Sequence, residues 1–362
     1  MKVNNIKKQK KKFSINFDVI KTLVVILIAL VVAFIIIFAV SEDPVRAFNK
    51  MFLGPFKSTR HFGNVIEMMI PLIFTGLGIS IMFKSRQFNL GVEGAFFLGA
   101  IGAVVVGTQV LMPKGIHPAL AILFGGLLGG LICTIPAVLK VKWKANEVVS
   151  SLMCNYLCLF LGLFIINNYL RDVDAGGMVS VPFAGSAGLP KLFDVTRIHV
   201  GLIIAVAMVI LVYLYLYKSK NGYELRMTGE NENFAKYTGI NVAKVIILTQ
   251  FLGGLIAGIG GATELLGMYT RFEWQVLPGY GWDGVIVALL AKNNPAFVPL
   301  TAFFIAYIRI GADIMSRSTD VPNEVVAIIQ GIIIVLIAAD SFLSYYKKKR
   351  TFKEATENVE LA

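Results

Sequence analysis

The sequence predicts an all-α membrane protein with about ten transmembrane helices. Apolar residues make up 56% of the 362 residues, charged residues make up 15%, and the mean hydropathy is +0.73. A soluble domain has about 25% charged residues. Several stretches of about 20 residues carry few or no charges, which is the length that crosses a hydrocarbon core roughly 30 Å thick. Most of the chain is therefore expected to form one membrane domain and not several soluble domains.

Ten apolar segments are the expected spans. They lie near residues 20–40, 63–84, 91–111, 117–140, 147–170, 198–218, 243–268, 282–292, 296–316 and 323–343. The eighth is short and is followed at once by LysAsnAsnPro, so a broken or partial span is the alternative there. We expect a basic extension at 1–18, one transmembrane domain at 19–345 and a polar tail at 346–362. The first apolar run is too long for a signal peptide and no cleavage site follows it.

The distribution of basic residues predicts the orientation. The formal net charge is +12. With the N-terminus inside, about 23 of the 34 Lys and Arg residues fall on the cytoplasmic side, as the positive-inside rule requires. We therefore expect a multi-pass protein of the cell membrane with both termini cytoplasmic, and no nucleic-acid partner. The loop at 171–197 is then outside, the loop at 219–242 is inside, and the segment 44–58 forms a helix at the outer surface.

Two short sequence motifs, called words below, each occur twice and in the same order. Gly-x-acid-Gly appears as GVEG at 91–94 and as GWDG at 281–284, and NEVV follows at 146–149 and at 323–326. In the predicted topology the first copies lie at inner ends of spans and the second copies at outer ends. A repeat whose direction is reversed is typical of transport proteins, which bind substrate between the two halves. The sequence therefore predicts two inverted-topology repeats.

Polar residues in or beside the spans are the candidate substrate contacts. A charge buried in hydrocarbon costs several kcal/mol, so such residues usually face a cavity or a partner. For Asn155 the alternative is a hydrogen bond that joins two helices. The predicted substrate pathway comprises Asn89, Glu93, Asn155, Glu264, Trp282 and Asp283.

The two NEVV words are interpreted as helix starts. Asn and Glu at the first turn of a helix satisfy free N–H groups and complement the positive helix end. We therefore expect capping and gating roles, more than substrate contact, for Asn146, Glu147, Asn323 and Glu324. Arg309 and Asp313 are four residues apart and can neutralise each other on one helix face.

Several functions are not indicated. The chain has no Gly-Lys-Ser phosphate loop, so no site for ATP of its own is predicted. Its three cysteines lie in apolar runs, without the spacing of a metal site or of a disulfide framework. We expect no catalytic residues, no metal and no cofactor, and hence a transport subunit and not an enzyme.

One inner segment carries a resemblance to a known family. The stretch GYELRMTGENENFAKYTGINVAKVIILTQFLGGLIAGIGGA (222–262) resembles the cytoplasmic coupling segment of permease subunits of bacterial ABC importers for branched-chain amino acids, ribose and other simple sugars, and nucleosides. FNLGVEGAFFLGA (88–100), ANEVVSSLMCNYL (145–157) and GYGWDGVIVALLAKNNP (279–295) resemble the same family. The likeness covers nearly the whole chain after residue 60 and is strongest to the nucleoside branch.

The resemblance implies a docking helix for an ATPase. The coupling segment, at about 222–242, would contain a short helix from about Glu230 to Tyr237, with Gly229 breaking the chain before it and Gly239 ending it. The coupling residues would be Gly229, Glu230, Asn231, Ala235, Tyr237 and Gly239. ATP hydrolysis on that partner would switch the permease between outward-facing and inward-facing forms.

The resemblance also implies the remaining partners. They are one or two ABC ATPase subunits, a second related permease that forms a heterodimer, and an extracellular, lipid-anchored substrate-binding protein. The predicted function is import of nucleosides by alternating access. The alternatives are a permease of the same family for ribose, other simple sugars or branched-chain amino acids, and a secondary transporter driven by H⁺ or Na⁺, which inverted repeats would suit equally well.

Overall fold

The computed structural model describes residue 28 and residues 31–322, 324–325, 327–332 and 335. The chain divides into two compact units. One comprises Ser58–Tyr307, and the other comprises Met1–Lys57 with Ile308–Ala362.

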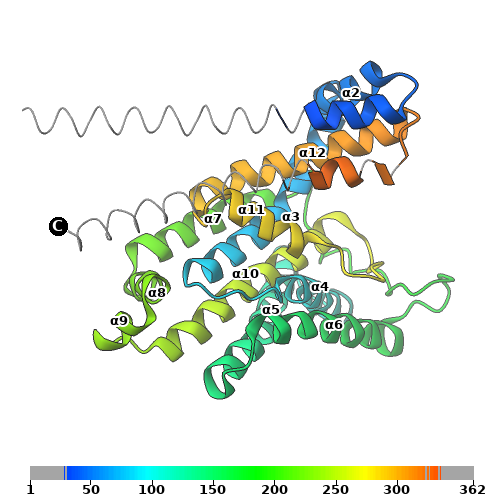
Figure 1. Ribbon diagram of the computed structural model, residues 1–362. Helices are drawn as coiled ribbons and strands as arrows, with labels where there is room; N and C mark the ends of the chain where they lie inside the picture. Colours follow the sequence, from blue (N-terminus) through cyan, green and yellow to red (C-terminus); the bar gives the residue numbers. More distant parts are fainter. Residues whose placement is uncertain (1–27, 29–30, 323, 326, 333–334, 336–362) are drawn as a thin grey trace, which may run out of the picture. The chain divides into compact units, whose positions relative to one another are not determined.

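The Ser58–Tyr307 unit is built from helices (Figure 1). Their bounds are α3 Thr59–Lys84, α4 Val92–Gln109, α5 Ile116–Trp143, α6 Glu147–Ile165, α7 Gly201–Lys218, α8 Lys220–Glu230, α9 Glu232–Tyr237, α10 Val242–Met268, α11 Tyr280–Leu290 and α12 Val298–Ser318. A π-helical turn at Ile166–Leu170 continues α6, and a 3-10 turn at Pro295–Phe297 precedes α12. The division between the two units falls within α12.

Seven of the described helices are long and apolar enough to cross a membrane. They are α3, α4, α5, α6 with its π-helical turn, α7, α10 and the stretch Pro295–Ser318. An all-α, multi-pass membrane protein is thereby confirmed, whereas the number of ten spans stays a prediction, because the first and tenth segments run into residues outside the described part. The eighth segment is a partial span: α11 has 11 residues, about 16 Å of helix, against a core of about 30 Å.

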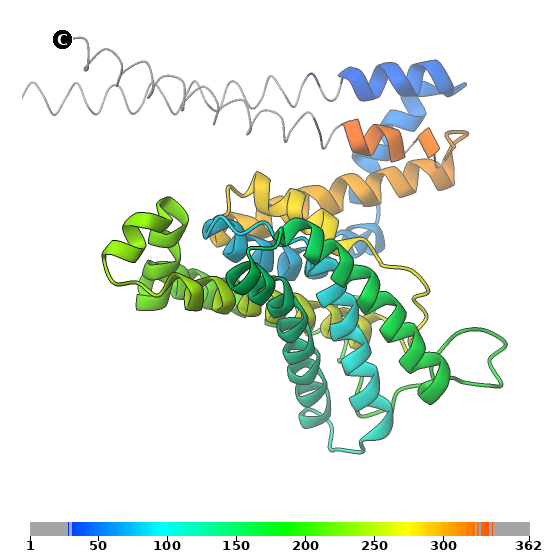
Figure 2. The ribbon, with the colours of Figure 1, turned by 60° about the horizontal axis from the view of Figure 1, so that its bottom comes forward.

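Helix α10 forms the centre of this unit, packed against α3, α4 and α5. Glycines make these contacts close. A Cβ atom placed on Gly258 would lie 2.5 Å from the carbonyl oxygen of Gly125 in α5, and one on Gly99 of α4 would overlap the backbone of Gly258. Small residues let helix backbones approach closely in a membrane, where no hydrophobic driving force holds helices together. The Gly-rich stretch FLGGLIAGIGGA (251–262) thus makes α10 the helix on which its neighbours assemble (Figure 2).

The short helix α11 packs on α3 in the same manner. A Cβ atom on Gly284, the last residue of GWDG, would lie 2.6 Å from the side chain of Thr75 in α3. A Cβ atom on Gly76 would lie 2.7 Å from Val287 of α11. Gly279, which precedes α11, has φ +88°, a left-handed conformation that favours glycine. The start of α11 is therefore fixed by glycine positions on both partners.

The loop between α6 and α7 is held to the segment that follows α10. The N–H of Phe272 donates to Ser180 Oγ at 2.9 Å, and the N–H of Ser180 donates to the carbonyl of Phe272 at 3.1 Å. Arg271 and Asp172 form an ion pair at 3.1 Å. These bonds satisfy backbone groups that a loop would otherwise leave unpaired.

In the unit formed by Met1–Lys57 and Ile308–Ala362, α2 (Pro44–Leu53) packs against the later part of α12. Asp43 caps α2 by accepting the N–H of Arg46 at 3.1 Å. A Cβ atom on Gly54, which follows α2, would lie 2.9 Å from Ile314. Ser41 Oγ donates to Asp320 at 2.7 Å. The helix expected at 44–58 is confirmed over most of that range, and its place at the membrane surface stays a prediction.

We predict that Gly258→Ala lowers the thermal stability of the protein, whereas Gly185→Ala does not. The added methyl at position 258 meets backbone atoms of α5 and not a movable side chain, and such overpacking costs about 1–3 kcal/mol. Gly185 has no atom within 4 Å of an added Cβ. Thermal midpoints of the two purified variants in one detergent test this. Equal midpoints would show that the close approach is not required.

Candidate functional site

The turn between α3 and α4 is held by Glu147, the acid of the first NEVV word. Glu147 Oε1 accepts the N–H of Phe88 at 2.5 Å, and Oε2 pairs with Lys140 Nζ at 2.7 Å. Lys140 Nζ also donates to Gln87 Oε1 at 2.6 Å. The first residue of α6 is thus bound to the end of α5 and to the turn that leads into α4.

Helix α10 joins the same set of contacts. Gln250 Nε2 donates to Glu147 Oε2 at 3.3 Å, and Gln250 Oε1 accepts from Asn89 Nδ2 at 2.5 Å. Asn89 Nδ2 also donates to the carbonyl of Cys133 in α5 at 3.2 Å. Asn89 and Gln250 are fully buried. We call Gln87, Asn89, Lys140, Glu147 and Gln250 the Glu147 network.

The Glu147 network fixes the relative positions of α5, α6, α10 and the α3–α4 turn. The Glu147 side chain is 8% exposed and that of Lys140 is 30% exposed. A buried ion pair does not guarantee stability, but removing one partner leaves a charge without its counter-ion at high cost. The carboxylate therefore anchors other segments, and the cap of α6 is its neighbour Asn146, whose Oδ1 accepts from Val148 N at 3.0 Å.

Asn155 holds the start of α4. Its Oδ1 accepts the N–H of Gly94 at 2.8 Å, and its Nδ2 donates to the carbonyl of Leu90 at 3.0 Å. The N–H of Leu90 donates to Ser151 Oγ at 3.0 Å. These bonds correspond to the alternative considered for Asn155, in which its amide joins two helices. A contact with substrate stays a prediction for this residue.

Glu93 brings the two Gly-x-acid-Gly words together. It lies in the first turn of α4, it is 1% exposed, and its carboxylate caps the start of α11. Oε1 accepts the N–H of Gly279 at 2.6 Å, Oε2 accepts that of Gly281 at 2.5 Å, and the N–H of Trp282 also bonds to this carboxylate. The positive end of a helix and its free N–H groups stabilise an anion. We call this arrangement the Glu93 junction.

The other residues of GWDG surround the junction. Asp283 is 3% exposed and lies close enough to Glu93 for their charges to interact. Trp282 is 45% exposed. Two acids predicted from separate motifs therefore lie at one place, where α4 and α11 both begin. The sequence analysis placed GVEG and GWDG at opposite ends of the spans, and the direct contact between them shows that this part of the prediction is wrong. Neither the repeat nor its spacing indicated that the first acid would cap the helix of the second word.

Glu264 lies on α10, and a second acid lies opposite it. Glu264 is 3% exposed and accepts a hydrogen bond from Tyr280 Oη at 3.4 Å. Glu67 of α3 is near enough for its charge to interact with that of Glu264. Sequence reasoning did not select Glu67, although a lone acid inside an apolar span is the signal that could have found it.

The segment predicted to couple to an ATPase forms α8 and α9, with boundaries that differ from the predicted ones. Gly229 does not break the chain: it lies inside α8, where a Cβ atom would overlap the carbonyl oxygen of Lys84. Glu230 is the last residue of α8. The break falls at Asn231, whose extended backbone and side chain cap α9 by accepting the N–H of Phe234 at 3.0 Å.

The end of α9 agrees with the prediction. Gly239 has φ +85°, and its N–H donates to the carbonyl of Lys236 at 3.0 Å. Ala235 is fully buried against α5 and α10, where it packs with Ala137, Val242 and Ile246. Tyr237 is 92% exposed and Phe234 is 51% exposed. The short helix is thus seated by Ala235 and presents two aromatic rings outward.

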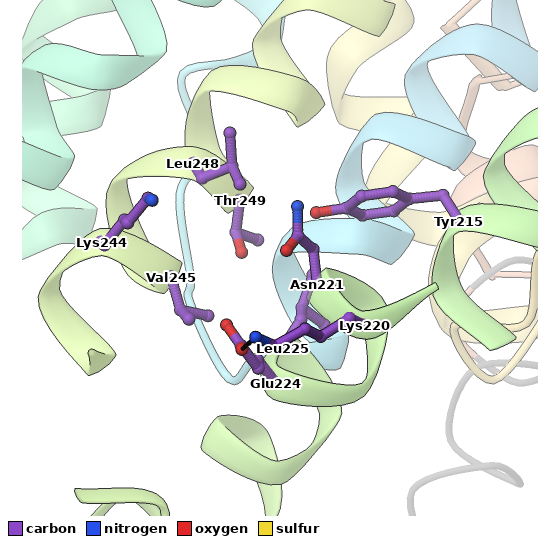
Figure 3. Close-up of a pocket in the computed structure, with 9 residues that line it drawn as sticks. All are labelled: Tyr215, Lys220, Asn221, Glu224, Leu225, Lys244, Val245, Leu248 and Thr249. Atoms are coloured by element: carbon purple, nitrogen blue, oxygen red, sulfur yellow. Dashed lines mark ion pairs between the residues drawn. The ribbon is translucent and has the colours of Figure 1, made fainter. Parts of the chain in front are cut away.

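A pocket of about 150 Å³ lies where α7, α8 and α10 meet (Figure 3). Lys220 and Glu224 of α8 line it, and their ion pair measures 3.9 Å. Lys244 and Thr249 line it from α10. A volume of this size has room for about five waters at ~30 Å³ each. It leaves space between α8 and α10 beside the coupling segment.

The second NEVV word is only partly described. Asn323 lies outside the described residues. Glu324 is helical and exposed, and the N–H of Val325 donates to the carbonyl of Pro322 at 3.1 Å. A gating role for these two residues stays a prediction. In α12, Asp313 pairs with Arg317 at 2.8 Å, an ion pair that the sequence analysis did not anticipate.

The chain is 32% identical over 339 residues to the guanosine ABC transporter permease protein NupP of Bacillus subtilis, covering 92% of this chain and 97% of that one. It is 26% identical to the nucleoside permease NupB of Lactococcus lactis, over 94% and 96% of the two chains. It is 29% identical to the glucose permease TsgB13 of Haloferax volcanii, over 85% and 84%.

A solved structure, PsaBC of Streptococcus pneumoniae in complex with Fab, matches with TM-score 0.44 and 14% identity over 82% of this chain and 94% of that one. Residues 62–338 match the family described as the permease component of branched-chain amino acid transport systems. That match covers most of the chain and includes the Glu147 network, the Glu93 junction and the coupling segment. The chain therefore belongs to this family of transport-system permease components.

Proposed function

We propose that this chain is the membrane-spanning permease subunit of an ATP-driven importer of nucleosides. The observation that carries the proposal is its similarity, over more than nine tenths of its length, to permeases named for guanosine and for nucleosides. The helical membrane unit and the α8–α9 segment support it. The work of this subunit is translocation, and ATP is hydrolysed on a separate ATPase.

The proposal includes specific partners. The ATPase docks on α9, and a substrate-binding protein, anchored by lipid, delivers the nucleoside from outside. A second related permease completes the pore, because NupQ of Bacillus subtilis and NupC of Lactococcus lactis also match this chain, at 25% and 27% identity. The protein lies in the cell membrane with both termini cytoplasmic, as the positive-inside count predicts.

A continuous set of contacts leads from α9 to the membrane interior. Gly229 of α8 lies against the carbonyl of Lys84, where α3 ends. The turn that follows is held by the Glu147 network and leads into α4, which carries Glu93 and hence the start of α11. Packed interiors transmit displacement because they have no free space. A movement of α8 driven by the ATPase would therefore reach the Glu93 junction through the α3–α4 turn.

A sugar importer is the second candidate. The glucose permease of Haloferax volcanii is nearly as similar as the guanosine permease. Ribose hydroxyls and glucose hydroxyls suit the same acceptor groups. Uptake of labelled guanosine, compared with uptake of labelled glucose and labelled ribose, separates the two, since a sugar permease would take up the sugar and no guanosine.

Replacing the exposed rings of α9 is expected to abolish coupling. In cells that carry the complete importer, Phe234→Ala with Tyr237→Ala should reduce guanosine uptake to background, because these rings are the apolar surface that α9 presents. The control is Tyr223→Ala, which removes a ring of α8 that is about as exposed as that of Phe234. Membrane insertion should not change. Normal uptake by the double variant would contradict docking of an ATPase at α9.

Glu147→Gln is expected to destabilise the permease, whereas Glu324→Gln in the second NEVV word is not. The first change leaves Lys140 without its counter-ion, at a cost of about 2 kcal/mol because Lys140 is partly exposed. Adding Lys140→Met to Glu147→Gln should restore part of the loss. Thermal midpoints of the three variants measure this, and equal midpoints for Glu147→Gln and Glu324→Gln would refute the anchoring role.

Glu93→Gln and Asp283→Asn should each impair guanosine uptake more than Arg309→Gln combined with Asp313→Asn. An amide at position 93 turns one acceptor into a donor that faces backbone N–H groups of α11, so a loss of about tenfold is expected. Initial uptake rates at equal expression give the comparison. Equal defects in all variants would remove any special role for the Glu93 junction.

A further inference from the structure

One end of the α3–α10 contact contains buried polar atoms for which the described residues offer no hydrogen-bond partner. They are Glu67 Oε2, Thr196 Oγ1, His199 Nε2, Thr263 Oγ1 and Glu264 Oε2. The residues lie together: a Cβ atom on Gly63 would meet Thr196, and one on Gly201 would meet both His199 and Thr263. Buried polar groups in native proteins are nearly always hydrogen-bonded, so a group of them without partners needs an explanation.

Glu67 and Glu264 face each other within this group. Helices α3 and α10 run antiparallel, since Gly78 packs on Gly253 near one end and Phe74 packs on Gly260 further along. Continuing one to two turns along this contact places Glu67 opposite Glu264, and the charges of the two carboxylates interact. Arg197 and Lys191 lie near enough to interact with Glu67. Two acids facing each other in a membrane interior cost stability, and such acids usually serve a substrate path.

Aromatic rings border the two acids. Tyr280 donates to Glu264 and lies 5.2 Å from Phe96, and Phe96 is stacked at 6.0 Å on Trp274. Tyr269 meets Trp274 edge-on at 5.7 Å. Tyr269, Trp274 and Tyr280 are partly exposed, whereas Glu264 lies buried behind Tyr280. Accessible flat rings therefore lie beside carboxylate oxygens that can accept further hydrogen bonds.

We propose that Glu264 and Glu67 bind the hydrogen-bond donors of the nucleoside during its passage, while the base lies against Trp274 and Tyr280. This inference rests on the proposed nucleoside function. It adds that the permease itself, and not only the binding protein, selects the substrate. The ligand chemistry is an aromatic ring next to paired O–H or N–H donors. Those donors are either the 2′- and 3′-hydroxyls of ribose or the N–H edge of guanine. A site built for such donors rejects analogues that lack them, because its acceptors then stay unpaired.

The test uses the complete importer, with its second permease, ATPase and binding protein, in proteoliposomes that receive ATP. Initial uptake rates are measured for guanosine, for 2′,3′-dideoxyguanosine, which lacks both hydroxyls, and for inosine, which lacks the 2-amino group. The binding protein is the same for all variants, so differences between variants report the permease alone. The variants are Glu264→Gln, Glu67→Gln and Tyr280→Phe. Glu273→Gln is the control, because Glu273 is exposed in the same region and carries the same charge.

We expect guanosine uptake to fall by about tenfold or more in both Gln variants, with KM and the ratio of guanosine to one analogue changing together. The control should match the wild type. Loss of discrimination against the dideoxy analogue assigns the ribose hydroxyls, and loss of discrimination against inosine assigns the guanine edge. Tyr280→Phe removes one hydroxyl, and we expect a smaller loss of discrimination in the same direction. This variant provides the test if a Gln variant does not assemble.

Two results would overturn the inference. If the assembled variants keep the wild-type ratios and gain thermal stability, the two acids are only a buried like-charged pair, and nucleoside import itself stands. If the wild-type importer takes up no nucleoside while its ATPase is active, both the proposed function and the inference fail. The two failures are thereby distinguished by the wild-type rate alone.

Discussion

The close approach of the α10 backbone to α3, α4 and α5 is the constraint on which the other features depend. In a membrane, apolar side chains gain little by leaving lipid for a neighbouring helix, so packing and hydrogen bonds must hold the helices. Glycines such as Gly99, Gly125 and Gly258 remove the side chains that would separate the backbones. Because α10 is fixed in this way, Gln250 reaches the Glu147 network and Glu264 reaches α3 and α11.

The buried acids of the membrane unit fall into two groups, which differ in whether their oxygens have hydrogen-bond partners. Glu147 is neutralised by Lys140 and by a backbone N–H, and Glu93 is stabilised by three backbone N–H groups at a helix start. Both are satisfied within the protein, and both join segments far apart in the sequence. Glu264 and Glu67 instead keep a buried oxygen that no described group satisfies. This contrast separates acids that hold the fold from acids available to a ligand, and it depends on counting hydrogen bonds, since all four look alike as acids in apolar segments.

The two copies of the Gly-x-acid-Gly motif have different roles in the folded chain, and so do the two polar residues of the first NEVV motif. Both Gly-x-acid-Gly words begin helices, α4 and α11, yet Glu93 of the first word reaches across to cap the helix of the second. Asn146 caps its own helix, while Glu147 beside it binds the α3–α4 turn. A repeated motif therefore predicts where helices start. The contacts that each copy makes are decided by which helix ends meet in the folded protein. The reversed direction of the two halves across the membrane stays a prediction.

The sequence by itself determined the class of the protein, most spans and the Asn146 cap of α6, because hydropathy, helix length and capping act over a few residues. The partial eighth span was one of two alternatives that it left open. Four separated motifs were also enough for the family. The true start of α9 was not predictable, since Gly229 is there to let α8 pack on Lys84, and its small size serves a contact and not a break. Likewise, the pairing of Glu67 with Glu264 and of Glu93 with α11 joins residues nearly 200 positions apart in each case. Only the tertiary structure decides such contacts, because they arise from which helices the glycines of α10 allow to meet.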